Sequence, residues 1–262
     1  MRSVWRRGIS SVVPGVVSFA IVLLGWEELV RLLSVSPLIL PPPSQIFEEF
    51  IKRADQIPIH AAVTLFEAVS GLCIGVGFAL VVSLLISEVP LFRRAIYPLI
   101  MAKQVVPTVV FAPILLVWFG YGVSSKIVIA GIICFFPVVV NALHGLTSLP
   151  VEVVELANSL GSSRWKTLIR LRLPHSVPHI YAAMRPSVGL AMIGAVVGEF
   201  IGGNSGLGYM IVESLRFLNL PAMFAATIAL IILGLMLFGL VELGGVIWLG
   251  WYRKSLRLQE PL

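Results

Sequence analysis

The sequence has few charged residues, only two cysteines and none of the short motifs that mark common catalytic sites. Charged residues make up 12% of the 262 residues, whereas soluble domains carry about 25%. Cys73 and Cys134 stand alone in apolar stretches, which argues against a disulfide framework or a cysteine metal site. No G-x-x-x-x-G-K-[ST], H-E-x-x-H or G-x-S-x-G stretch occurs. The sequence therefore excludes P-loop binding of ATP and lacks these protease and hydrolase signatures.

Apolar residues dominate instead. They make up 58% of the chain and gather in runs of the length that crosses a bilayer, about 20 residues. We predict an all-α integral membrane protein with about six transmembrane helices. Gly71, Gly75 and Gly77 give the second span a face of small residues for close helix packing. Pro107 and Pro113 interrupt the third span. The predicted spans cover residues 9–33, 59–86, 95–119, 127–143, 179–201 and 221–248.

The distribution of charge predicts the orientation of these spans. The net charge is +6, and the basic side chains concentrate on the segments that would face the cytoplasm, as the positive-inside rule requires. This placement excludes nucleic acid as the partner of the basic residues. We predict a multi-pass protein of the cell (inner) membrane with both termini in the cytoplasm.

The chain divides into three parts. Residues 1–57 form a first transmembrane helix and an external interfacial segment, in which a stiff proline-rich connector leads to a short amphipathic helix over 45–53. Ser44 is predicted to cap that helix. Residues 58–251 form the core, and residues 252–262 form a cytoplasmic tail.

A polar stretch over residues 155–174, ELANSLGSSRWKTLIRLRLP, interrupts the apolar second half of the chain. Its sequence predicts a short helix over 155–160 that ends at Gly161 in the left-handed conformation. Ser162 or Ser163 can cap a second helix, and Pro174 is expected to limit its length. The result is a helix-turn-helix held at the membrane surface by basic side chains.

This stretch resembles the EAA loop of ABC-importer permeases, the binding-protein-dependent inner-membrane components. That signature reads E-A-A, three residues, G, nine residues, I-x-L-P. The chain has the same spacing, with Leu156 in place of the first Ala and Leu171 in place of Ile. An ordinary cytoplasmic hairpin is the alternative. The stretches PPPSQIF, PILLVWFGYGVSSK and GEFIGGNSGLGYMI also resemble the sulfonate/nitrate/taurine branch of the family.

The resemblance implies a type I permease fold with an EAA coupling loop at 147–178. It further implies two ATPase subunits, a second permease copy, an external substrate-binding protein and the lipid bilayer as partners. The chain would bind no cofactor and would not be an enzyme, since ATP-Mg would sit on the partner ATPase. It would pass a small solute, such as a sulfonate-, nitrate- or taurine-like anion or a related organic compound. The implied coupling residues are Glu155, Leu156, Ala157, Gly161, Arg164, Leu171, Leu173 and Pro174. Val154, Ala157 and Leu160, at i, i+3 and i+6, are expected to supply one apolar docking edge.

Three ionisable residues inside the predicted spans are candidates for the translocation path or for an ion pair. Charged groups in hydrocarbon are costly and usually face a partner or a cavity. Glu67 and Lys103 each lie roughly 13 Å deep, so they are predicted to pair near the midplane. Glu199 is the better pathway candidate, because it lies where the fifth span meets a glycine-rich outer loop.

Two other functions remain open at this point. An ion-coupled carrier acting without an ATPase would need a chain of intramembrane acids, and the chain offers only scattered groups. A membrane enzyme acting on lipid would need a carboxylate pair or a metal site. His175 and His179 are four residues apart, but Pro178 lies between them, so we predict hydrogen bonding rather than metal binding.

Overall fold

The structure, a computed structural model, describes residues 2–103 and 106–248; of residues 2–13, 16, 101, 103 and 248 it describes only the backbone. Throughout that part the chain forms helices and turns, which confirms the predicted all-α class. Four of its helices are long and apolar enough to cross a membrane, namely Gln56–Glu88, Val123–Thr147, Arg164–Gly202 and Leu220–Ile247. The total of six spans stays a prediction, and the tail at 252–262 lies outside the described residues.

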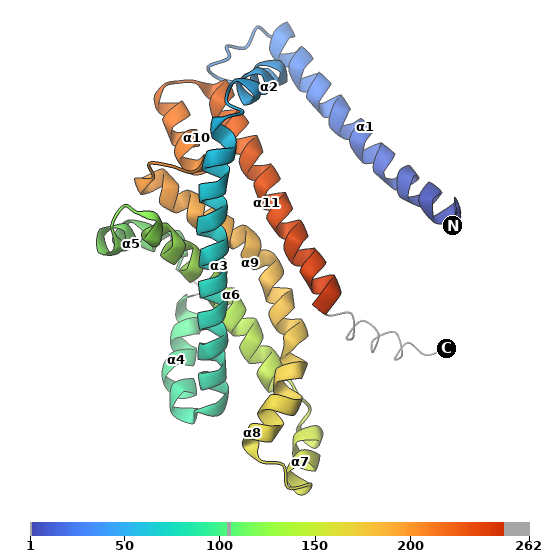
Figure 1. Ribbon diagram of the computed structural model, residues 1–262, viewed down its shortest axis with the longest axis vertical. Helices are drawn as coiled ribbons and strands as arrows, with labels where there is room; N and C mark the ends of the chain where they lie inside the picture. The colour runs from blue at the N-terminus through green and yellow to red at the C-terminus, as the bar shows by residue number, and fades with distance from the viewer. Residues whose placement is uncertain (1, 104–105, 249–262) are drawn as a thin grey trace.

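The N-terminal part consists of α1 (Arg2–Leu32), which stands away from the other helices in Figure 1, and the short α2 (Pro43–Lys52). The prediction that Ser44 caps the second helix is wrong. Pro43 begins α2, and the Glu27 carboxylate of α1 accepts hydrogen bonds from the Ser44 backbone N–H (3.0 Å) and hydroxyl (2.8 Å). A proline suits the first helical position, and a carboxylate is favoured at a helix N-terminus.

Three helices pack tightly at the centre: α3 (Gln56–Glu88), α6 (Val123–Thr147) and α9 (Leu173–Gly202). Their backbones touch because small residues meet. A Cβ added to Gly75 would overlap the Gly131 carbonyl oxygen, and one added to Gly194 would overlap the backbone of Ala130. The predicted small-residue face on the second span is confirmed at Gly71 and Gly75, whereas Gly77 has nothing within 4 Å.

The predicted third span is divided into α4 (Pro90–Lys103), the 3-10 turn η1 (Thr108–Phe111) and α5 (Ala112–Phe119). The expected break occurs at Pro107, which is extended (φ −60°, ψ 120°). Pro113 instead lies in the first turn of α5, where a missing N–H costs no hydrogen bond. Figure 1 shows α5 projecting sideways from the helix bundle.

After α6 the chain forms α7 (Val151–Ser159), α8 (Arg164–Thr167) and the π-helical η2 (Leu168–Arg172), which leads into α9. The prediction that Pro174 limits this helix is wrong. The helix runs on to Gly202, because a π turn precedes the proline, with the Leu173 N–H bonded to the Leu168 carbonyl. This wider turn accommodates a ring that has no N–H to donate.

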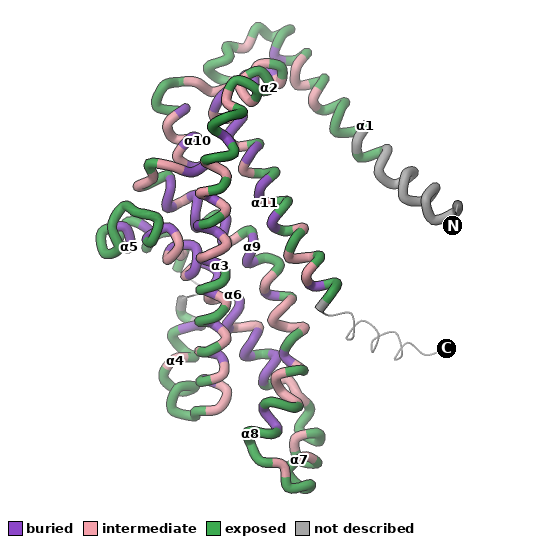
Figure 2. Tube along the Cα trace, in the orientation of Figure 1, coloured by how far each residue is buried: buried purple, intermediate pink, exposed green. Residues whose placement is uncertain are grey.

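The chain ends with α10 (Leu207–Arg216) and α11 (Leu220–Trp248). In Figure 1, α7 and α8 lie at one end of the bundle, and α2 and α10 lie at the other. We refer to these as the α7 end and the α10 end. Figure 2 shows buried residues on the facing sides of α3, α6 and α9, and exposed residues around them. Many of the exposed residues are large and apolar, as expected of helices that face lipid.

Candidate functional site

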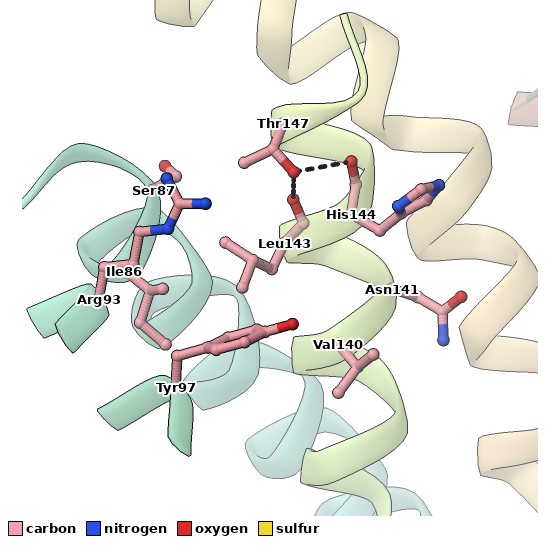
Figure 3. Close-up of a pocket in the computed structure, with 9 residues that line it drawn as sticks. All are labelled: Ile86, Ser87, Arg93, Tyr97, Val140, Asn141, Leu143, His144 and Thr147. Carbon is pink, nitrogen blue, oxygen red and sulfur yellow. Dashed lines mark hydrogen bonds between the residues drawn. The ribbon is translucent and has the colours of Figure 1, made fainter. Parts of the chain in front are cut away.

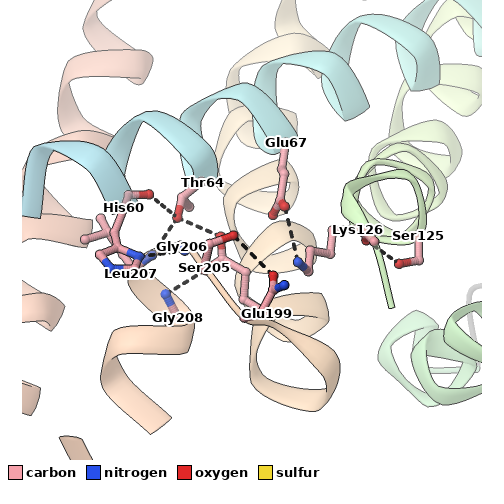
Figure 4. Close-up of polar contacts among 12 residues, drawn as sticks. His60, Thr64, Glu67, Ser125, Lys126, Glu199, Ser205, Gly206, Leu207 and Gly208 are labelled. Atoms are coloured by element: carbon pink, nitrogen blue, oxygen red, sulfur yellow. Dashed lines mark hydrogen bonds and ion pairs between the residues drawn. The ribbon is translucent and has the colours of Figure 1, made fainter. Parts of the chain in front are cut away.

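The structure brings charged and polar side chains together between α3, α6, α9 and the start of α10. We call this group, formed by His60, Thr64, Glu67, Lys126 and Glu199, the polar cluster (Figure 4). Glu199 is 1% exposed near the end of α9. Its carboxylate accepts hydrogen bonds from the Thr64 hydroxyl (2.7 Å) and from the Gly208 backbone N–H (2.6 Å). Bonds this short to a carboxylate are among the strong ones in proteins.

The polar cluster supplies the N-terminal cap of α10. The first N–H groups of a helix have no partner inside it. Here the Leu207 N–H donates to the Thr64 hydroxyl (2.8 Å), and the Gly206 N–H donates to Nδ1 of His60 (3.0 Å). Accepting at Nδ1 requires a neutral imidazole ring. Side chains of α3 and α9 therefore fix where α10 begins, which sequence analysis missed because the partners are distant in the chain.

Glycines around Glu199 make this arrangement possible. Gly206 has φ +103°, and a Cβ there would overlap the Glu199 carboxylate. A Cβ on Gly208 would lie 2.6 Å from Oε2 of Glu199. The glycine-rich stretch was expected to be an irregular outer loop. Only residues 203–206 are non-helical; the residues before them end α9, and those after them begin α10.

The second feature of the cluster is a buried ion pair between Glu67 and Lys126, with 3.5 Å between Oε1 and Nζ and no exposed surface on either side chain. Neither carboxylate oxygen of Glu67, nor the Lys126 ammonium, makes a hydrogen bond to the described residues. The structure thus gives Glu67 a partner other than the predicted Lys103, whose side chain lies outside the described part. The physical reason is the packing of Gly71 and Gly75 on α6, which brings the start of α6 level with Glu67.

Lys126 lies directly before the predicted fourth span, 127–143, and so outside the predicted membrane-spanning residues. It is instead the fourth residue of α6, and its stem packs so closely on α9 that a Cβ on Gly198 would lie 2.8 Å from Lys126 Cγ. A lysine usually buries its apolar stem and keeps its ammonium in water; burial of the ammonium as well, as here, requires a partner for the charge. The sequence signal for this packing was the small residue Gly198 on α9. A small residue does not by itself show which side chain packs against it.

The polar stretch at the α7 end forms the predicted helix-turn-helix, which we call the α7 hairpin (residues 151–172). Gly161 has φ +74°, and the Ser162 N–H donates to the Ala157 carbonyl (2.9 Å), as in a Schellman cap. Ser163 caps α8 by accepting from the Lys166 N–H (3.4 Å). The left-handed glycine and the serine cap are confirmed.

Two details of the α7 hairpin differ from the prediction. The first helix begins at Val151, not at Glu155, so Glu152 rather than Glu155 occupies the first turn, where an acid favours the helix dipole. The expected apolar edge of Val154, Ala157 and Leu160 is half-buried at its first two members. Leu156 (62%) and Leu160 (78%), four residues apart on one face, are instead exposed. Other exposed apolar side chains of the hairpin are Val151, Val153, Trp165 and Ile169.

The remaining predicted coupling residues lie at the second arm of the hairpin. Arg164 begins α8 and is exposed, Leu171 and Leu173 are half-buried, and Pro174 is exposed in the first turn of α9. An ion pair that sequence analysis missed joins this arm to α3, since Arg172 donates to Glu88 (2.9 Å). It ties the base of the hairpin to the end of a central helix.

Three histidines gather beside the hairpin. His144 and His179 have ring centroids 5.2 Å apart, and those of His175 and His179 are 5.8 Å apart. His175 Nε2 lies 3.2 Å from the Ser148 hydroxyl, which confirms the predicted hydrogen bonding. Within the described part of the chain, no three metal-ligating side chains are arranged to hold an ion.

Tightly packed apolar helices, an internal charge cluster and a polar hairpin at one end are the features of a multi-span membrane protein. The chain belongs to the family of binding-protein-dependent transport system inner membrane components, whose model matches residues 71–243. This match falls inside the predicted core, 58–251, and includes the α7 hairpin. Family membership favours the permease over the ion-coupled carrier and over the lipid enzyme.

Individual relatives are similar over most of their length. The chain is 34% identical to a probable ABC transporter permease protein of Haemophilus influenzae, over 83% of this chain and 89% of that protein. It is 33% identical to the formylaminopyrimidine transport permease protein ThiX of Halalkalibacterium halodurans, over 90% and 95%. It is 30% identical to the taurine transport system permease protein TauC of Escherichia coli, over 89% and 88%.

Proposed function

We propose that this chain is the transmembrane subunit of an ATP-driven importer, which passes a small solute from an external binding protein into the cytoplasm. The observation that carries this proposal is the family match over residues 71–243. The solute is a sulfonate-, nitrate- or taurine-like anion or a related small organic compound. Relatives named for taurine and for formylaminopyrimidine transport support this range.

The α7 hairpin couples the chain to two partner ATPase subunits, which bind ATP-Mg and hydrolyse it. In this arrangement the α7 end and both termini face the cytoplasm. Leu156 and Leu160 on α7 and Trp165 on α8 support the role, because exposed apolar side chains at the tip of the hairpin suit a protein partner. Gly161 sets the direction of α7, and Arg164 begins the second arm.

A second permease copy completes the membrane unit. The turn at Gly120 between α5 and α6 lies close to Lys126, which meets Glu67 about three turns inside α3. Irregular backbone at such a depth is not tolerated against lipid and needs protein around it. Val117 (75%) and Trp118 (74%) on α5 are nonetheless exposed in the single chain. A second copy covering α5 supplies that protein.

Disulfide crosslinking tests this interface. In a Cys73→Ser background, Val117→Cys is expected to give crosslinked dimers, whereas the equally exposed Leu235→Cys on α11 serves as the control. Crosslinking at Leu235 alone would place the interface elsewhere and overturn the assignment.

Within this unit, we propose that the polar cluster has a structural role. Glu67 and Lys126 join α3 to α6, and Glu199 joins α9 to the start of α10, so the cluster keeps four helices in register. The alternative, that these side chains line the path, predicts altered solute selectivity in variants that fold normally.

Reconstitution tests the proposed function. The solute is first identified by a thermal-shift screen of the cognate binding protein. Vesicles holding the chain alone, or the chain with its ATPase and binding protein, are then compared for uptake of that solute. Uptake is expected only in the complete system and only with ATP. Uptake by the chain alone in response to an ion gradient would overturn the proposal in favour of the carrier.

A further inference from the structure

A cavity of about 440 Å³ lies between the α3–α4 hairpin and α6, toward the α7 end (Figure 3). It falls within the range of about 300–1,000 Å³ that small-molecule sites occupy. Its lining comes from three helices. The lining residues are Ile86, Ser87, Arg93, Tyr97, Val140, Asn141, Leu143, His144 and Thr147.

The charge of this lining has one sign. Arg93 is its only residue with a permanent charge, and no acidic side chain lines the cavity. The Arg93 guanidinium makes no ion pair or hydrogen bond to the residues that the structure describes, although its backbone N–H donates to the Val89 carbonyl. The nearby acid Glu88, next in sequence to a lining residue, is already paired with Arg172. A guanidinium in this state binds carboxylate, sulfonate or phosphate groups through two parallel hydrogen bonds.

The rest of the lining fits a small organic body. Ile86, Val140 and Leu143 supply an apolar wall, and the Tyr97 hydroxyl makes no hydrogen bond within the described part. Asn141 donates to the Pro137 carbonyl (2.8 Å), which leaves its side-chain oxygen able to accept. One cation, one free hydroxyl and an apolar wall are the few convergent groups that orient a ligand in a pocket.

We infer that this cavity binds a small organic anion, a sulfonate or carboxylate with a short apolar body, on the release side of the transport path. The assignment of side and ligand rests on the proposed function, which puts the α7 end in the cytoplasm. The phosphate of an anionic lipid has the same charge chemistry, so the test separates the two sources.

The test is equilibrium binding of radiolabelled ethanesulfonate to the full-length chain in phosphatidylcholine nanodiscs. Saturable binding is expected, with no competition by ethyl methyl sulfone, an uncharged molecule of similar size. Arg93→Gln is expected to weaken binding about tenfold or more. Arg94→Gln is the matched control, because it removes the same charge from the next residue, which is exposed like Arg93 but lies outside the lining, and it should leave binding unchanged.

Three results would overturn the inference: no saturable binding, equal loss in the Arg93 and Arg94 variants, or displacement of the probe by phosphatidylglycerol in the disc, which would identify the ligand as lipid. The assay needs neither ATP nor a partner. Failed binding beside normal ATP-driven uptake therefore removes only this site, whereas normal binding without ATP-driven uptake removes only the proposed function.

Discussion

The two ends of this permease use charge in opposite ways. At the α10 end the polar cluster is buried, and Glu67, Lys126 and Glu199 have almost no exposed surface. At the α7 end the basic and acidic side chains are largely exposed, and so are apolar ones such as Leu156 and Leu160. Buried charges hold helices together and are costly to disturb. Exposed ones add little to stability, so the α7 hairpin is free to serve a partner.

The strongest test of this contrast is removal of Lys126. Lys126→Met leaves Glu67 buried without its cation, and the loss of one partner from a buried pair costs about 3–5 kcal/mol. We expect a large fall in the free energy of unfolding, measured by denaturant titration in detergent. Glu67→Gln combined with Lys126→Met should recover much of the loss.

A double-mutant cycle supplies the control for this prediction. Strong coupling between positions 67 and 126 is expected. Independent, additive effects of the two substitutions would show that the pair does not hold α3 to α6.

Loss of the Glu199 carboxylate should have the next largest effect. Glu199→Ala leaves the Gly208 N–H without its acceptor and leaves the Thr64 hydroxyl only its weaker bond to the His60 carbonyl (3.2 Å), which costs about 2–3 kcal/mol. Glu199→Gln keeps one acceptor oxygen and should lose roughly half as much. Thermal unfolding of the unsubstituted protein and of both variants measures this order of stability. If the Gln and Ala variants were equally unstable, the two hydrogen bonds would not be the source of the effect.

Substitution of Gly161 should lower stability less than loss of the Glu199 carboxylate does, but it should abolish coupling. With φ +74°, this position strains a β-branched residue by about 1–2 kcal/mol, and nothing lies within 4 Å to stop a side chain. Gly161→Val is therefore expected to insert normally and to lose solute uptake and ATPase co-purification. Gly161→Asn is the matched control, since asparagine tolerates this conformation. Normal uptake by the valine variant would remove the coupling role of the hairpin.

The smallest effects are expected on the surface of α7. Leu156→Ser and Leu160→Ser should leave thermal stability unchanged within about 0.5 kcal/mol and reduce ATPase co-purification. Glu155→Ala should change both quantities less, because Glu155 lies in mid-helix and not at the positive end of the dipole. A pull-down assay compares the three variants. A larger loss from Glu155→Ala would show that the docking surface is ionic rather than apolar.

The features that sequence analysis predicted correctly depend on residues close together in the chain. A long apolar run forms a helix whatever surrounds it in lipid, which accounts for the four helices that are long and apolar enough to cross a membrane. Gly161 and Ser163 act on groups within five residues of themselves. The spacing of the EAA-like stretch is likewise local, and it led to the family that the match over 71–243 establishes.

Only the tertiary structure decided which distant groups meet. Thr64 and Glu199 are 135 positions apart, and Thr64 and Leu207 are 143 apart. The choice of Lys126 for Glu67 follows from backbone contact at Gly75 and Gly131, where the absence of side chains sets the relative height of α3 and α6. Sequence reveals that a charge in a membrane helix needs a partner, but helix register selects the partner, and register depends on packing that no single segment contains.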